Sequence, residues 1–173
     1  TYLDARRNLA AAYHRAYFDR EAGLYAVDGV GYRQTMNAMP LALLAVPESE
    51  TRRVLDALVL DIEQRTNGHL DCGAIGVKHL LPALRRHGRV DLALTVATQR
   101  TEPSWGAWMS SGNGTLWEAW SGARSCNHFF LGSAAEHFDG SRVAVHDPVG
   151  VEYANRVLGA FKEHAILFFA FVQ

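Results

Sequence analysis

Short amphipathic segments, separated by loops that contain glycine, follow one another along most of this sequence. In one of them Val54, Leu58 and Ile62 recur at four-residue spacing, which places their side chains on one face of an α-helix. Helices joined by short loops stack antiparallel to their neighbours. The pattern predicts an all-α architecture, with helices at about 2–18, 33–45, 48–66, 76–87, 90–100 and 127–138.

The segments between these helices show few signs of strands. Gly23 and the pair Gly29 and Gly31 indicate a loop after the first helix, and no alternation of strands and helices is visible. Pro40 lies inside the second predicted helix, where a proline removes a backbone hydrogen bond and usually produces a kink. We therefore expect a helical domain with long loops at one end and short loops at the other.

Composition excludes several classes of protein. A chain of 173 residues, 49% hydrophobic, suits one domain with a packed core. The net charge of −1 and the scattered cationic residues argue against nucleic acid as a partner. Two cysteines without CxxC spacing, and eight histidines without HxH or HxxxH pairs, predict no metal site and no disulfide framework. No apolar run reaches the roughly 20 residues of a membrane span, so we expect no membrane partner; the compartment, cytoplasmic or secreted, stays open.

The loop at 101–128 carries the strongest functional signal. It contains all four tryptophans of the chain, with Glu118 between two of them and His128 ten residues further on. A glycosidase needs flat apolar surfaces for the C–H faces of a sugar and carboxylates for acid–base work. On these residues alone two interpretations stay open: Glu118 is a catalytic carboxylate in a sugar site lined by the tryptophans, or the tryptophans belong to the core and Glu118 is a solvated loop residue.

Three separated motifs resemble the catalytic domain of bacterial α-L-rhamnosidases (glycoside hydrolase family 78). They are QTMNAMPLALLAVPE at 34–48, GHLDCGAIGVKHLLPAL at 68–84, and PSWGAWMSSGNGTLWEAW followed by SCNHFFLGSAAEHF at 103–138. The resemblance covers about residues 2–138. It implies an (α/α)6 six-hairpin barrel and inverting hydrolysis of terminal α-L-rhamnosides without a cofactor. It also implies Glu118 as the catalytic general base and a substrate-binding set of His128, Trp105, Trp117 and Trp120, with His128 in contact with the sugar.

Two departures from the family limit this reading. The general acid of the family lies on an earlier segment, and the upstream carboxylates Asp4, Asp19, Glu21 and Asp28 are better explained as helix-end and loop charges. Residues 1–138 then form about half of a barrel, and 139–173 a divergent tail with a helix near 150–171. We expect unpaired apolar helix faces to lead to association with a missing barrel half or with a second copy.

Two other functions remain open from the sequence. The chain could be a helical carbohydrate-binding or structural remnant that uses the tryptophan loop without catalysis. It could also be an (α/α)6 glycosidase with a different sugar specificity. In the same family context, His69 in GHLD is a candidate for lining the sugar pocket, and Cys72 and Cys126 are expected to be small buried side chains.

Overall fold

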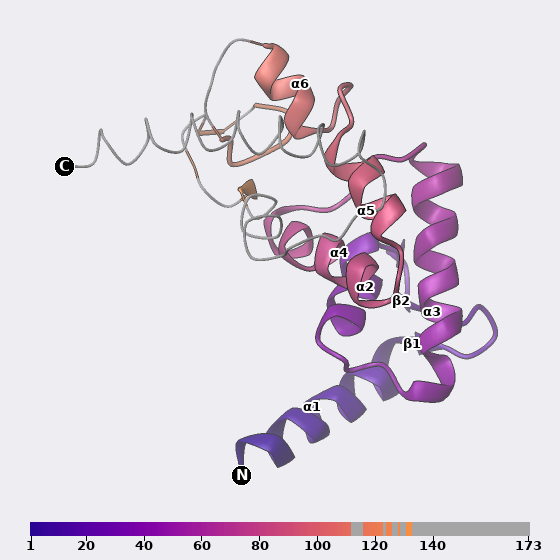
Figure 1. Cartoon of the computed structure of the whole chain (residues 1–173). Coiled ribbons are helices and arrows are strands. Elements are labelled where there is room, and N and C mark those ends of the chain that lie inside the picture. The colour runs from indigo at the N-terminus through magenta and orange to yellow at the C-terminus, as the bar shows by residue number, and fades with distance from the viewer. Residues whose placement is uncertain (112–115, 123, 126–127, 129–130, 133–173) are drawn as a thin grey trace.

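The computed structural model describes residues 1–111, 116–122, 124–125, 128 and 131–132, which form a helical body with a small sheet (Figure 1). The described α-helices are α1 (Tyr2–Tyr17), α2 (Gln34–Ala42), α3 (Glu48–Leu60), α4 (Ala74–Arg86), α5 (Val90–Ala97) and α6 (Trp105–Ser110). A π-helical turn, Asp61–Arg65, extends α3. The predicted helical fold is confirmed, and its first five helices lie close to their expected positions.

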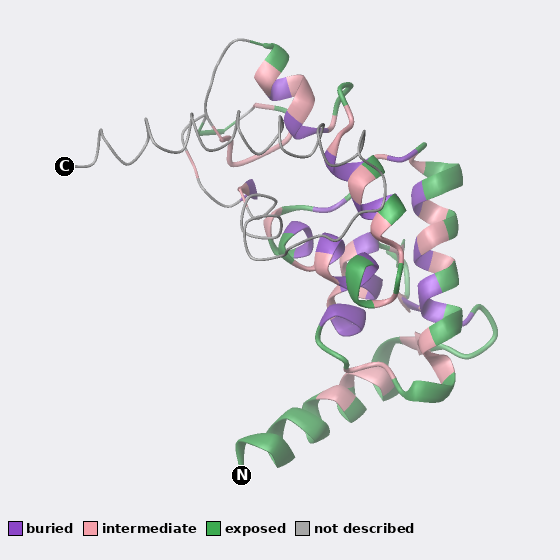
Figure 2. Ribbon diagram, viewed as in Figure 1, coloured by how far each residue is buried: buried purple, intermediate pink, exposed green. Residues whose placement is uncertain are grey.

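The core of the described region is built around α2 and α4, which lie side by side and carry six buried residues each (Figure 2). A glycine makes their close approach possible: a Cβ atom on Gly76 would lie 2.1 Å from Oγ1 of Thr35 and 2.5 Å from Cβ of Cys72. Val54, Leu58 and Ile62 of α3 and its π-helical extension are fully buried, as the apolar stripe predicted.

Pro40 does not end α2, which continues to Ala42. A proline at this position cannot donate a backbone hydrogen bond to the carbonyl of Met36, four residues earlier. The hydroxyl of Tyr13 donates to that carbonyl instead, at 3.0 Å. A side chain from α1 thus satisfies the acceptor that the proline leaves without its helical partner.

The loop expected between α1 and α2 contains a three-stranded antiparallel meander, β1 (Phe18–Asp19), β2 (Leu24–Val27) and β3 (Gly31–Tyr32). The fully buried side chain of Asn37 fastens it to α2. Its amide accepts a hydrogen bond from the backbone N–H of Tyr25 at 2.8 Å and donates to the Tyr25 carbonyl at 3.0 Å. Strands of two to four residues are too short to show a period in the sequence, which explains why they were not predicted.

Helix α1 projects from the body and buries none of its residues (Figures 1 and 2). It is attached at its C-terminal end, where the rings of Tyr13, His14 and Phe18 pack against Tyr25 at centroid distances of 5.1 to 5.8 Å. Leu9, predicted on the same face as Tyr13, is 72% exposed. Association through such exposed apolar residues stays a prediction.

The C-terminal part of the fold differs from expectation in one described element. Trp105–Ser110 forms α6 inside the segment predicted as a loop, and Ser104 caps it by accepting the backbone N–H of Ala107 at 3.0 Å. Most of the predicted helix at 127–138, and all of the tail at 139–173, lie outside the described residues. Among the residues that the structure describes, none of the helices combines the length and apolar character that a membrane crossing requires.

Candidate functional site

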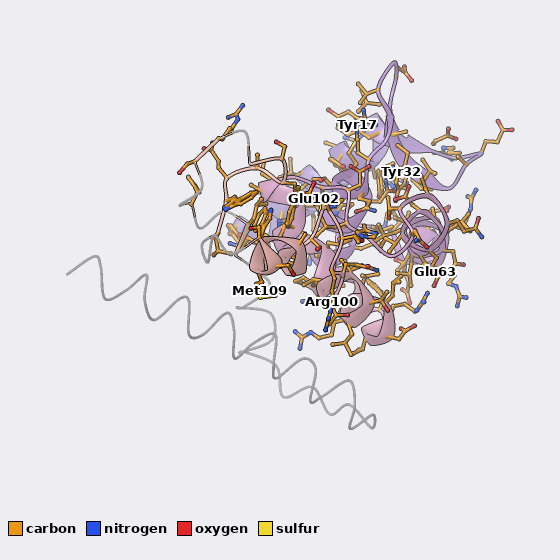
Figure 3. All side chains as sticks on the ribbon, turned by 90° about the horizontal axis from the view of Figure 1, so that it is seen from above. Tyr17, Tyr32, Glu63, Arg100, Glu102 and Met109 are labelled. Carbon is orange, nitrogen blue, oxygen red and sulfur yellow. The ribbon has the colours of Figure 1, made fainter. Side chains whose placement is uncertain are left out.

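The four tryptophans form one cluster at the end of the body that carries α6. Trp108 stacks on Trp120 with ring centroids 4.5 Å apart, and the ring centroid of Trp117 lies 5.2 Å from that of Trp108. Trp105 meets Trp120 edge-on at 5.4 Å. Seen from above, Met109, which follows Trp108 on α6, lies on the opposite side of the body from Tyr17, the last residue of α1 (Figure 3). The cluster is therefore remote from α1.

Hydrogen bonds from the indole rings fix the cluster to the rest of the chain. Trp120 donates from Nε1 to the carbonyl of Cys72 at 2.8 Å, and Trp108 donates to the carbonyl of Trp120 at 3.4 Å. Trp105 donates to the carbonyl of Leu131 at 2.6 Å and is only 1% exposed. Trp120 thus joins the tryptophan segment to the loop between α3 and α4, while Trp105 packs beneath it and presents almost no surface to solvent.

Glu118 lies between Trp117 and Trp120 on a segment that is paired with a second one. Its backbone N–H donates to the carbonyl of Ser125 at 2.9 Å, and the N–H of His128 donates to the carbonyl of Leu116 at 2.8 Å. These two bonds place the predicted residues Glu118 and His128 on adjacent antiparallel segments. The Glu118 side chain is 29% exposed, and its Oε1 lies 3.4 Å from Nη1 of Arg124.

Trp117 precedes Glu118 in the chain, and its ring lies close to the backbone of Gly122. Gly122 has φ +67°, and a Cβ atom there would lie 2.8 Å from the Trp117 ring, so only glycine fits both the backbone and the space. The indole Nε1 of Trp117 is buried and has no hydrogen-bond partner within the described part of the chain. A buried N–H group without a hydrogen-bond partner costs free energy, and such groups are rare in folded proteins.

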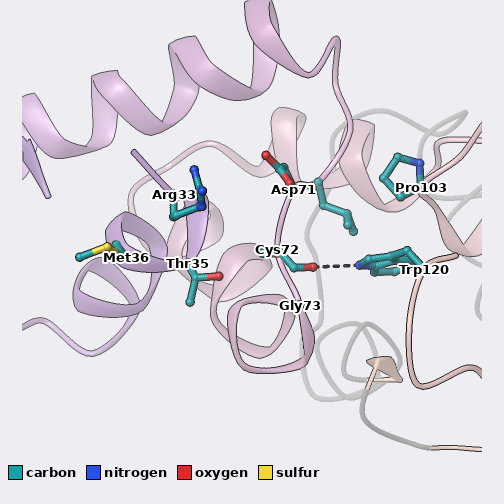
Figure 4. A pocket seen from close by; sticks show the side chains of 9 residues that line it. Arg33, Thr35, Met36, Asp71, Cys72, Gly73, Pro103 and Trp120 are labelled. Carbon is teal, nitrogen blue, oxygen red and sulfur yellow. Dashed lines mark hydrogen bonds between the residues drawn. The ribbon is translucent and has the colours of Figure 1, made fainter. Parts of the chain in front are cut away.

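A pocket of about 550 Å³ lies beside the cluster (Figure 4). Arg33, Thr35 and Met36 line one side of it, Pro103 and Trp120 the other, and the loop Asp71–Gly73 runs between them. Of the predicted site residues only Trp120 lines this pocket. Sequence reasoning missed Arg33, Asp71 and Pro103 because they belong to separate loops; a carboxylate inside the glycine-containing GHLDCG segment was the one available signal.

Asp71 is held in place by a buried polar network. Its backbone N–H donates to Oε1 of Gln34 at 2.6 Å, and Gln34 is fully buried. Its carboxylate forms an ion pair with Arg65 at 2.7 Å. Arg65 also binds Asp61, which in turn accepts a hydrogen bond from Gln34 at 2.9 Å. Asp61 and Arg65 are the first and last residues of the π-helical turn, an irregularity that occurs frequently at functional sites.

The other residues considered from the sequence are His69 and the two cysteines, and the contacts of His69 and Cys72 indicate structural roles. His69 bridges two loops, with Nε2 2.8 Å from Oγ1 of Thr101 and Nδ1 3.0 Å from the carbonyl of Thr66, and it does not line the pocket. Burial raises the pKa of the Cys72 thiol to about 12, which removes it as a thiolate nucleophile. Cys126 lies outside the described residues.

The upstream carboxylates serve helix ends and turns where the structure records their contacts. Asp4 belongs to the capping box of α1, and its hydrogen bond with Thr1 lowers the pKa of its carboxyl. Asp19 accepts the backbone N–H groups of Glu21 and Ala22, both at 2.9 Å. Within the described residues, no group of three or more His, Cys, Asp or Glu side chains is arranged to hold a metal ion.

Comparison with known proteins gives a consistent result. The bacterial alpha-L-rhamnosidase 6 hairpin glycosidase domain matches residues 1–140. An alpha-L-rhamnosidase of Streptomyces avermitilis is 32% identical over 148 residues, which cover 78% of this chain and 14% of the relative. One of an Alteromonas species is 28% identical, covering 79% of this chain and 16% of that protein.

Solved structures show the same similarity. The crystal structure of the Streptomyces avermitilis alpha-L-rhamnosidase complexed with L-rhamnose has a TM-score of 0.67 at 30% identity, covering 77% of this chain and 13% of that one. The alpha-L-rhamnosidase from Dictyoglumus thermophilum gives a TM-score of 0.66, also at 30% identity, covering 73% and 14%. The chain thus spans about a seventh of the length of these relatives.

Proposed function

Because the chain belongs to the family of bacterial alpha-L-rhamnosidase six-hairpin glycosidase domains, we propose that it contributes to the hydrolysis of terminal α-L-rhamnosides. The observation that carries the proposal is the setting of Glu118. Its carboxylate is partly exposed, its neighbour Trp120 is anchored by a hydrogen bond to Cys72, and its segment is paired with the one that carries His128.

Glu118 acts as the general base. Its carboxylate takes a proton from a water molecule as that water attacks the anomeric carbon, on the face opposite the departing oxygen, so the configuration inverts. In inverting enzymes the second carboxyl group, the general acid, lies about 6.5–9.5 Å from the base. We assign no general acid within the described residues, since Asp4 and Asp19 are engaged at a helix cap and a turn.

The aromatic residues and His128 hold the sugar. Trp117 offers an indole surface to the C–H faces of the ring, and Trp120, one face of which Trp108 covers, borders the sugar beside it; both are only partly buried. The imidazole of His128 supplies a hydrogen bond to a sugar hydroxyl. Trp105, with 1% exposure, supports Trp120 from beneath and acts on the sugar through it.

Rates with α-L-rhamnosyl fluoride test the general base without requiring an acid. Fluoride leaves without being protonated, so this substrate isolates the step in which Glu118 deprotonates water. We expect the 173-residue chain to hydrolyse it, and Glu118→Gln to reduce the rate by about 10²–10⁴-fold. Glu48→Gln, an exposed glutamate on α3, serves as the matched control and should leave the rate unchanged.

Two results would separate the alternatives. A rate that is the same in Glu118→Gln and in the wild type would remove the general-base assignment. Calorimetric binding of L-rhamnose without any turnover of the fluoride would favour the non-catalytic carbohydrate-binding function instead.

A further inference from the structure

The proposed role of Glu118 as general base assigns no ligand to the pocket between α2, the Asp71–Gly73 loop and Trp120. Its volume of about 550 Å³ lies within the ~300–1,000 Å³ typical of small-molecule sites. We infer that it binds a second sugar unit, covalently linked to the rhamnose on which Glu118 acts. This inference rests on the proposed function and names the part of the substrate that the pocket recognises.

One wall of the pocket is suited to hydroxyl groups. Arg33 offers a guanidinium, which only donates hydrogen bonds, and Asp71 a carboxylate, which accepts them. Thr35, beside Arg33, can do both. Hydrogen bonds to charged groups are about twice as strong as neutral ones, so a donor and an acceptor of this kind select a polyhydroxylated ligand.

Asp71 is prepared for this role by the network around it. Arg65 holds Oδ2 at 2.7 Å and Gln34 holds the backbone N–H at 2.6 Å, while the side chain stays 54% exposed. Within the described part of the chain, Oδ1 makes no recorded hydrogen bond or ion pair. The carboxylate is therefore fixed in orientation and still has an oxygen that can accept a hydroxyl, which limits the entropy lost on binding.

The opposite wall is apolar and rigid. Pro103 and the indole of Trp120 form it, and Trp120 is fixed by its hydrogen bond to Cys72 at 2.8 Å and its stacking on Trp108 at 4.5 Å. An aromatic wall facing a polar one matches a pyranose ring, whose faces present C–H groups and whose edge presents hydroxyls.

The reacting rhamnose itself does not fit this location. A general base must lie within hydrogen-bond reach of the attacking water, yet neither Glu118 nor His128 is among the described residues that line the pocket. Trp120, two residues after Glu118, is the shared wall between the two sites. The pocket is thus adjacent to the catalytic position and separate from it.

Calorimetric titrations with two probes test the inference. The probes are L-rhamnose and a sulfur-linked disaccharide of L-rhamnose and D-glucose, which is not hydrolysed. We expect the chain to bind the disaccharide about tenfold more tightly than L-rhamnose. Arg33→Met, which removes the donor, and Gly73→Leu, which fills the pocket, should each abolish this advantage and change the affinity for L-rhamnose less than twofold.

Control variants show that these effects belong to the pocket. A Cβ atom on Gly73 meets no described atom within 4 Å, and its φ of −84° suits any residue, so the added side chain enters open space. Arg15→Met repeats the arginine substitution and Ala12→Leu introduces a leucine, both at exposed positions of α1, and both should preserve the advantage. Circular dichroism and thermal unfolding establish that each variant is folded.

The possible outcomes distinguish this inference from the proposed function. Equal affinities for the two probes, or an advantage that survives both pocket variants, would overturn the inference while rhamnose binding still supports the function. A loss of L-rhamnose binding in Gly73→Leu would identify the pocket as the rhamnose site and also overturn it. If the chain binds neither L-rhamnose nor the disaccharide, both proposals are contradicted.

Discussion

Helices α1 and α4 are similar in length but differ in what stabilises them. Of the 16 residues of α1 none is buried, whereas six of the 13 residues of α4 are buried, among them Leu80 and Leu84. Helix α1 begins at a capping box formed by Thr1 and Asp4. Helix α4 has no side-chain cap and contains Pro82. Local hydrogen bonds can start a helix, but burial of an apolar face allows one to form despite a proline.

The largest expected contrast comes from removing one leucine in each helix. Leu80→Ala should lower the free energy of unfolding by about 2–5 kcal/mol, because the side chain is 1% exposed and its loss leaves a cavity. Leu9→Ala should change it by less than about 0.5 kcal/mol, because this leucine is largely in solvent. Urea unfolding measures both. A cost at Leu9 that matches the cost at Leu80 would mean that α1 is covered in solution, for example by a second copy.

A smaller contrast is expected between two glycines of the same region. Gly76→Ser should cost about 1–3 kcal/mol, because the new Cβ atom would overlap Thr35 and Cys72 and push α2 and α4 apart. Gly73→Ser should be neutral or slightly stabilising, because serine is a preferred N-cap and the space is open. Thermal unfolding of the two variants separates them. Equal melting temperatures would argue against the close contact between α2 and α4.

The attachment of α1 can be weakened by one hydroxyl group. Tyr13→Phe should lower the free energy of unfolding by about 1 kcal/mol. The substitution leaves the Met36 carbonyl without a donor, because Pro40 has no backbone N–H to offer it. Tyr2→Phe makes the same change on an exposed tyrosine of α1 and should have no effect. If the two variants unfold at the same urea concentration, Tyr13 does not replace the hydrogen bond missing at Pro40.

The smallest expected effect is a pH dependence of stability that arises from His14, where the end of α1 packs against Tyr25. Burial lowers the pKa of His14 below its ordinary 6.5, and the Tyr25 hydroxyl lies 3.0 Å from its Nδ1. The folded chain therefore binds a proton less readily than the unfolded chain, so stability is complete above that value and falls as pH drops below it. His14→Phe should reduce this fall, measured as urea midpoints across the pH range. His79, whose pKa is also lowered by burial, leaves a residual dependence of the same sign in both proteins. An unchanged pH profile would contradict the assignment to His14.

The sequence predicted those parts of the fold that depend on a period of apolar residues. The stripe of Val54, Leu58 and Ile62 is buried as expected, although its last member lies in a π-helical turn. The meander was missed because its strands are too short to show a pattern. Helix α6 was missed because six residues rich in tryptophan resemble a loop until their burial is known.

The candidate site was predictable only where its residues are close in sequence. Glu118, Trp117 and Trp120 form one motif and were found together, and the structure adds that Trp120 is anchored to Cys72 from a distant loop. The pocket could not be predicted, because Arg33, Asp71 and Pro103 meet through tertiary packing. The two residues that orient Asp71 are likewise distant in sequence: Arg65 lies in the π-helical turn after α3, and the buried Gln34 begins α2.

The configuration of the first product shows whether Glu118 activates water for an inverting hydrolysis. Proton NMR can follow the hydrolysis of α-L-rhamnosyl fluoride by the 173-residue chain before the released sugar mutarotates. We expect β-L-rhamnose to appear first and its formation to slow sharply in Glu118→Gln. Initial release of α-L-rhamnose, or formation of the β anomer at the same rate in Glu118→Gln, would contradict this mechanism.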